Sequence, residues 1–170
     1  LIDRAIIERA LAEGTDETPI APGLNAEALA ERWHAVDELP FDFERRRLSV
    51  VVGDVDGQTR MICKGAIEEV LAVCVDVEVN GCVRPLTDEE RRRVTARAEA
   101  LANEGMRVLG VARKANPAGA GSLTVEDERE MTLIGYLAFL DPPKASSAKA
   151  IRALAAHGVP FELHVYPFGW

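Results

Sequence analysis

Four short stretches of the sequence carry residue types suited to binding a planar or charged ligand. The first runs from Pro40 to Arg47 and places two phenylalanines beside three consecutive arginines. An aromatic ring offers its face to a planar group, and guanidinium groups neutralise anions. The same composition also fits two core phenylalanines followed by a solvated turn, and the local sequence alone favours that simpler interpretation.

The other three stretches are ambiguous when each is taken singly. In Cys63 to Ala66, a lysine precedes two small residues that would let a ligand approach the backbone at the start of a helix. A lysine at a strand end is, however, more often a surface residue. Gly105 to Ala112 places Arg107 at the entrance of an apolar run, where an arginine is more commonly a salt-bridge partner. Asp141 to Lys144 contains two prolines and is, on local grounds, a stiff corner.

Several common reaction sites are missing from the sequence. It contains no Walker A loop, no GxSxG nucleophile elbow and no metal-binding cluster. The three cysteines show no CxxC spacing, which indicates reduced, partly buried thiols of a cytosolic domain, and the three histidines are scattered. We therefore expect neither a metal ligand nor a catalytic nucleophile in this chain.

The composition describes a globular chain with an acidic balance. Of 170 residues, 48% are apolar and 28% are charged, which allows one compact domain with a real core. The net charge of −8 argues against a nucleic-acid binder, which normally carries a basic face. The longest apolar run, Leu133 to Leu140, is too short to span a bilayer. A first residue other than methionine fits an excised fragment.

Hydrophobic periodicity and turn signals predict the elements that position these stretches. Helices are expected over 1–13, 25–33, 66–74, 88–103 and 146–156, strands over 48–54, 58–64, 107–114 and 131–140, and an extended segment over 34–40. Asp56-Gly57 and Asn80-Gly81 are hairpin signals, and Thr87 to Glu90 is a capping box. Strands joined by hairpins, with helices between some of them, predict an α+β fold: a twisted, mainly antiparallel sheet flanked by helices.

Taken together in this order, the stretches resemble the nucleotide-binding (N) domain of the P-type cation-transporting ATPases. That family's features are matched by Pro40-Phe41, Lys64-Gly65-Ala66, Gly105 to Ala112 and the hinge Asp141-Pro142-Pro143. The opening segment, Leu1 to Ile6, also looks like the family's helix with an acidic residue near the adenine. The resemblance covers residues 1–157. The segments 41–52 and 136–144 look most like the bacterial magnesium-transporting branch.

The resemblance implies roles for residues at the base end of the site. Phe41 would stack on the adenine ring, and Asp3 would accept a hydrogen bond from the adenine amino group. Phe43 has no counterpart in the family, and we expect it to pack in the core.

The remaining matched residues would contact the rest of the nucleotide. Lys64 would lie at the pocket floor, where Gly65 and Ala66 allow close backbone approach. Arg107 would reach the phosphates, and Arg46 would be another basic contact. The ligand would be ATP or ADP, with Mg²⁺ arriving as the ATP complex and not held by the domain's own side chains.

The resemblance also implies a division of the chain. Residues 1–140 would form the nucleotide-binding domain, 141–144 the hinge, and 145–170 a fragment of the adjoining phosphorylation domain. A Thr-Gly-Asp is expected after the last helix. The tail from Pro160 to Trp170 departs from that pattern and is assigned no function.

The implied function is to deliver ATP inside a bacterial inner-membrane transporter. This cytoplasmic domain would present the γ-phosphate to an aspartate in a separate phosphorylation domain, and hydrolysis would be coupled to magnesium transport. Its partners would be the phosphorylation and actuator domains, without nucleic acid or direct membrane contact, and the isolated chain would bind ATP without turnover. The alternatives are a proton or other cation pump and a non-enzymatic protein-interaction domain. A stand-alone hydrolase is disfavoured because no nucleophile constellation is present.

Overall fold

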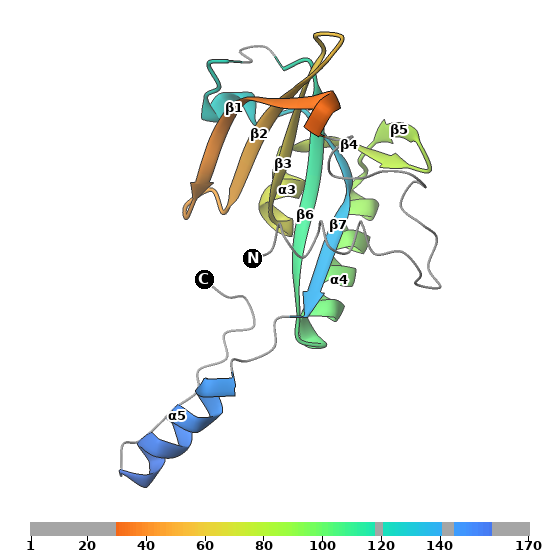
Figure 1. Cartoon of the computed structure of the whole chain (residues 1–170). Helices are drawn as coiled ribbons and strands as arrows, with labels where there is room; N and C mark the ends of the chain where they lie inside the picture. Colours follow the sequence, from red (N-terminus) through yellow and green to blue (C-terminus); the bar gives the residue numbers. More distant parts are fainter. Residues whose placement is uncertain (1–29, 118–120, 141–144, 158–170) are drawn as a thin grey trace.

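A seven-stranded sheet forms the centre of the protein (Figure 1). The computed structural model describes residues 30–117, 121–140 and 145–157. The strands are β1 (Trp33–Asp42), β2 (Arg47–Asp54), β3 (Thr59–Ala66), β4 (Cys74–Val79), β5 (Cys82–Pro85), β6 (Met106–Ala115) and β7 (Met131–Leu140). The helices are α3 (Ile67–Val73), α4 (Asp88–Asn103), α5 (Ala145–Ala156) and the short 3-10 helix η1 (Val125–Asp127).

The strands lie in the order β1-β2-β3-β6-β7-β4-β5. Neighbouring strands are antiparallel in each pair except β4 and β7, which run parallel. This arrangement confirms the expected α+β fold with a mainly antiparallel sheet. β7 joins strands β1, β2, β3 and β6 to the β4–β5 hairpin, because it pairs with β6 on one side and with β4 on the other.

Local turn and cap signals form where the sequence predicts them. Asn80 and Gly81 have φ values of 52° and 78°, as a type I′ turn between β4 and β5 requires. The Thr87 hydroxyl accepts from the Glu90 N–H at 3.3 Å, and the Glu90 carboxylate accepts from the Thr87 N–H at 3.1 Å. This capping box starts α4, which ends just before Gly105, where φ is 84°.

Helices α3 and α4 lie on the same side of the sheet, which we call the covered face (Figure 1). The core beneath them consists mainly of Val51, Met61, Cys63, Ile67, Val70, Leu71, Cys74, Ala112, Met131 and Leu133. Gly110 lets α3 approach β6 closely, since a Cβ at this position would lie 2.9 Å from the Ile67 Cδ1 atom. We call the opposite side of the sheet the open face.

One predicted helix ends earlier than expected. Residues 30–32 are helical, but Trp33 already belongs to β1 and not to the helix expected to include it. The Arg60 guanidinium lies 4.9 Å from the centroid of the Trp33 ring, and this cation–π contact links the start of β1 to β3 across β2. The helix expected over 146–156 is confirmed as α5. The helix expected over 1–13, which contains Asp3, and the hinge residues Asp141, Pro142 and Pro143 lie outside the described residues.

Candidate nucleotide-binding site

Lys64 lies within the open face. Its neighbours in sequence along β3 are buried on the covered face, so the alternation of a strand directs Lys64 to the other side. Backbone register places Leu48 of β2 and Val111 of β6 directly beside it, and Ile62 and Ala66 flank it along its own strand. These four neighbours are apolar and half-buried. The lysine therefore stands on an apolar floor, where its attraction to an anion is less screened than in bulk water.

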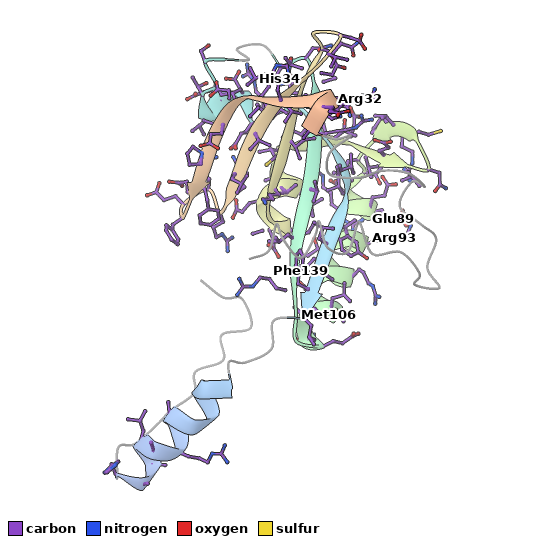
Figure 2. The ribbon with its side chains drawn as sticks, viewed as in Figure 1. Arg32, His34, Glu89, Arg93, Met106 and Phe139 are labelled. Atoms are coloured by element: carbon purple, nitrogen blue, oxygen red, sulfur yellow. The ribbon has the colours of Figure 1, made fainter. Side chains whose placement is uncertain are left out.

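Arg107 lies on the same face, nearer the start of β6. It precedes Val111, the register partner of Lys64, by four residues, so the two positions are about 13 Å apart along the strands. Arg107 is exposed, and its register partner is Phe139. Figure 2 labels Phe139 on β7. One extended ligand with an anionic end could therefore contact both Lys64 and Arg107.

Gly65 is required by packing between two of the stretches that the sequence singled out. A Cβ at Gly65 would lie 2.4 Å from the Arg47 Cβ and 2.5 Å from the Arg46 carbonyl oxygen. The N–H of Ala66 donates to that same Arg46 oxygen at 3.0 Å. The structure thus brings the lysine-glycine-alanine stretch into direct contact with the arginine stretch. This contact explains the glycine without a ligand.

Phe41 lies at the end of β1, the strand beside β2 at the edge of the sheet. Its side chain is 50% exposed, and its ring meets the Phe43 ring edge to face, with 5.3 Å between centroids. Phe43 is 87% exposed, so the expectation that it packs in the core was wrong. It lies in the turn between β1 and β2, where no core reaches it. The two rings form an accessible aromatic pair.

The turn that follows Phe41 is held by its own polar groups. A carboxylate oxygen of Asp42 accepts from the N–H groups of Glu44 at 2.9 Å and Arg45 at 2.8 Å. The Asp42 carbonyl accepts from the N–H of Arg46 at 2.7 Å. Arg46 has a φ of 47°, in the left-handed region, so the chain reverses here before entering β2.

The three arginines of the turn share two acidic partners, Glu69 and Glu128. Arg46 donates to Glu69 of α3 at 2.5 Å, and this hydrogen bond raises the pKa of Arg46. Arg45 and Arg47 both donate to Glu128, at 2.6 and 2.8 Å. The Arg46 side chain is 36% exposed, whereas those of Arg45 and Arg47 are 16% and 11% exposed. Arg46 is therefore the most accessible of the three to a ligand.

Comparison with known proteins assigns this architecture to a family. Residues 3–146 match the family described as the P-type ATPase, cytoplasmic domain N. The chain belongs to this family. The N-domain fold inferred from the order of four short motifs is thereby confirmed.

Relatives of this N domain include transporters for two different ions. It is 45% identical over 154 residues to a protein of Salmonella typhimurium (strain 14028s / SGSC 2262) named magnesium-transporting ATPase, P-type 1. It is 44% identical over 154 residues to the Escherichia coli K12 protein of the same name. Each alignment covers 91% of this chain and 16% of the relative, so the chain spans about a sixth of these proteins. A calcium-transporting ATPase 1 of Lactococcus lactis is 31% identical over 131 residues, 77% of this chain and 15% of that protein.

Glu128 is the residue of the N domain that sequence reasoning missed. Its side chain is fully buried and accepts hydrogen bonds from Arg45, Arg47 and, at 2.7 Å, from the Ser49 hydroxyl. It follows η1 and is separated from these partners by 79 to 83 residues. No local pattern identifies it, because an acidic residue in a polar loop normally faces solvent.

The buried Glu128 should make the N domain sensitive to acid. Burial by itself raises the pKa of this carboxyl group, but hydrogen bonds from Ser49, Arg45 and Arg47 outweigh burial and hold the pKa below its usual value. Its stabilising contribution is therefore complete above the unfolded-state pKa, about 4.3, and is lost as the pH falls through the lower folded-state pKa. We expect the melting-temperature difference between wild type and Glu128→Gln to be constant from about pH 7 to 5 and to shrink below about pH 4. Thermal unfolding followed by circular dichroism measures it, and a difference unchanged by acid would contradict this expectation.

The N domain also has a shallow cavity of about 370 Å³ away from the predicted site residues. Arg60, Glu78, Asn80, Gly81, Arg113 and Ile134 line it. Arg113 donates to Glu78 at 2.7 Å, so much of the charge in the cavity is already paired. Among the described residues, no group of three His, Cys, Asp or Glu side chains could hold a metal ion. No helix in the same residues is long and apolar enough to cross a membrane.

Proposed function

We propose that this N domain binds ATP across the open face and belongs to a transporter that couples ATP hydrolysis to magnesium transport. The observation that carries the proposal is the position of Lys64, a cation on an apolar floor formed by β2, β3 and β6. The γ-phosphate would be presented to an aspartate in a separate phosphorylation domain. The named magnesium transporters support the choice of ion, at 45% and 44% identity.

We expect the base and the phosphates of the nucleotide to contact different residues of the domain. Phe41 would stack on the adenine, with Asp3 accepting from the adenine amino group. Lys64, beside the small residues Gly65 and Ala66, would lie below the nucleoside. Farther along the open face, Arg107 would reach the phosphates. Arg46 would have to exchange its contact with Glu69 for the nucleotide or hold both at once.

The affinity should be weak because the site is an open face. Base stacking contributes about 1–3 kcal/mol, and each charge-assisted hydrogen bond about 1.5–3 kcal/mol. Lost translational and rotational freedom opposes these contributions by about 4–15 kcal/mol. We therefore expect dissociation constants for ATP and ADP that are similar to each other and in roughly the millimolar range. Mg²⁺ would enter as the ATP complex.

Replacing Lys64 tests the proposed site. Lys64→Gln should weaken ATP binding several-fold, because it removes a charge from an apolar floor and leaves the strand in place. It should also slow labelling by lysine-reactive adenosine analogues, from which ATP should protect the wild type. Titration followed by NMR measures the first effect, and mass spectrometry of the labelled chain measures the second.

Lys114 provides the control for this experiment. It pairs in register with the buried Met61, which places it on the covered face, and its ammonium donates to the Arg129 carbonyl at 3.0 Å. Lys114→Gln should leave both ATP affinity and nucleotide-protected labelling unchanged. If the two substitutions behave alike, Lys64 is an ordinary surface residue. If the wild type binds no adenine nucleotide, the chain is better described as a protein-interaction domain. Ion uptake by the full-length protein separates a magnesium transporter from a proton or other cation pump.

A further inference from the structure

The buried carboxylate of Glu128 is connected to the backbone that carries Phe41. We propose that Glu128 is a positioning residue: acting through Arg45, it fixes the Phe41 ring at the height and angle at which it meets a base. This inference rests on the proposed function for the identity of the ligand. The connection itself follows from contacts in the structure.

Arg45 forms the link between Glu128 and Phe41. One end of its guanidinium group donates to Glu128 at 2.6 Å, and the other end donates to the carbonyl of Pro40 at 2.8 Å. That carbonyl belongs to the peptide bond directly before Phe41. On the other side of Phe41, the Asp42 carboxylate is fixed by the N–H groups of the turn. The backbone of Phe41 is therefore held at both neighbouring residues.

The backbone at Phe41 needs the support of Arg45 because the regular pairing of β1 with β2 is interrupted there. The register of β1 and β2 shifts between Leu39 and Asp42, so Pro40 and Phe41 lie in a bulge. A bulged residue lacks the regular ladder that would otherwise set its direction. Within this bulge, the Arg45 guanidinium donates to the Pro40 carbonyl.

The same carboxylate also fixes the start of β2. Arg47 donates to Glu128 at 2.8 Å and packs against Gly65, next to Lys64. Glu128 therefore holds the two segments that would meet the base and the pocket floor. A buried ion pair is weak evidence for stability, because apolar residues of the same volume often stabilise as much. The carboxylate instead orients the side chains around it, since three donors converge on its two oxygens.

Two variants test this connection. Glu128→Gln keeps the shape and removes the charge, and Arg45→Gln removes the bridging guanidinium while leaving Glu128 paired with Arg47. Protein labelled with 4-fluorophenylalanine reports ring positions by fluorine NMR without any nucleotide. In both variants the Phe41 and Phe43 resonances should shift or broaden, and that of Phe139 on β7 should not. The dissociation constant for ATP should rise about three- to tenfold in both variants, because a misplaced ring loses only part of the stacking energy.

Glu78→Gln is the matched control, because it breaks a partly buried ion pair, that with Arg113, outside the proposed site. It should leave the Phe41 resonance and the ATP affinity as in the wild type. If Glu128→Gln does not fold, Arg45→Gln decides the question alone. Unchanged ring resonances and unchanged ATP affinity in a folded variant would overturn the proposal and leave Glu128 a stabilising residue only. If the wild type binds no ATP, the proposed function fails, while the fluorine spectra still show whether Glu128 positions the ring.

Discussion

Phe41→Ala should abolish detectable ATP binding and leave the fold intact. Stacking of a base on an aromatic ring contributes about 1–3 kcal/mol, a factor of roughly 5 to 150 in the dissociation constant. Since the wild type is expected to bind in roughly the millimolar range, a loss in the upper part of this range moves binding beyond practical titration. Phe41 is 50% exposed and lies in the edge strand of the sheet, so removal of its ring should cost little stability. NMR titration and thermal unfolding of the same sample measure both quantities.

Phe43→Ala is the natural comparison, because the two rings touch each other and differ in exposure. Phe43 is 87% exposed, and its edge-to-face contact with Phe41 is worth about 0.5–1.5 kcal/mol. We expect a small change in melting temperature and a partial loss of affinity. If Phe43→Ala eliminates binding and Phe41→Ala does not, the assignment of the stacking ring is reversed.

Gly65→Ala should strongly destabilise the fold, because an added Cβ is more crowded here than at Gly53 or Gly110. The new Cβ would lie 2.4 Å from the Arg47 Cβ and 2.5 Å from the Arg46 carbonyl oxygen, and one of these neighbours is backbone that cannot rotate away. Strands β2 and β3 would have to separate at their paired ends, at a cost of about 3 kcal/mol or more. ATP binding should fall with it, because Lys64 and Ala66 move with the strand. Urea unfolding measures the loss.

Gly57→Ala separates crowding from backbone strain. Gly57 has a φ of 78°, but a Cβ there would meet nothing within 4 Å. The cost should be about 1–2 kcal/mol of conformational strain, without any effect on ATP binding. A Gly65→Ala variant that is more stable than Gly57→Ala would show that β2 and β3 yield easily at this point.

The elements of the fold were predicted where their signals are local. Thr87 and Glu90 satisfy each other within one helical turn, and Asn80-Gly81 closes a hairpin without help from distant residues. The order of the strands has no such signal. That β4 pairs with β7 in parallel depends on the packing of α3 and α4 against the sheet, which a single sequence does not reveal.

The candidate site was predicted unevenly for a related reason. Lys64 obeys the alternation of a regular strand, so its direction follows from its buried neighbours. Phe43 was misplaced because it was assigned to the core only for want of a counterpart in the family, whereas it lies exposed in the turn between β1 and β2. Glu128 could not be found at all, since its partners lie far away in the sequence.

β7 lies between β6 and β4 in the sheet but follows both in the sequence, which matters while the domain is being synthesised. As the chain emerges, the β4–β5 hairpin is complete at Pro85 and β6 at Ala115, whereas β7, which lies between β6 and β4, begins only at Met131. Until residues 131–140 leave the exit tunnel, β4 and β6 each have an unpaired edge, which is a template for pairing with other chains. The nascent domain is therefore most vulnerable to aggregation after β6 has emerged and before β7 has, and a chaperone would have its greatest effect in that interval.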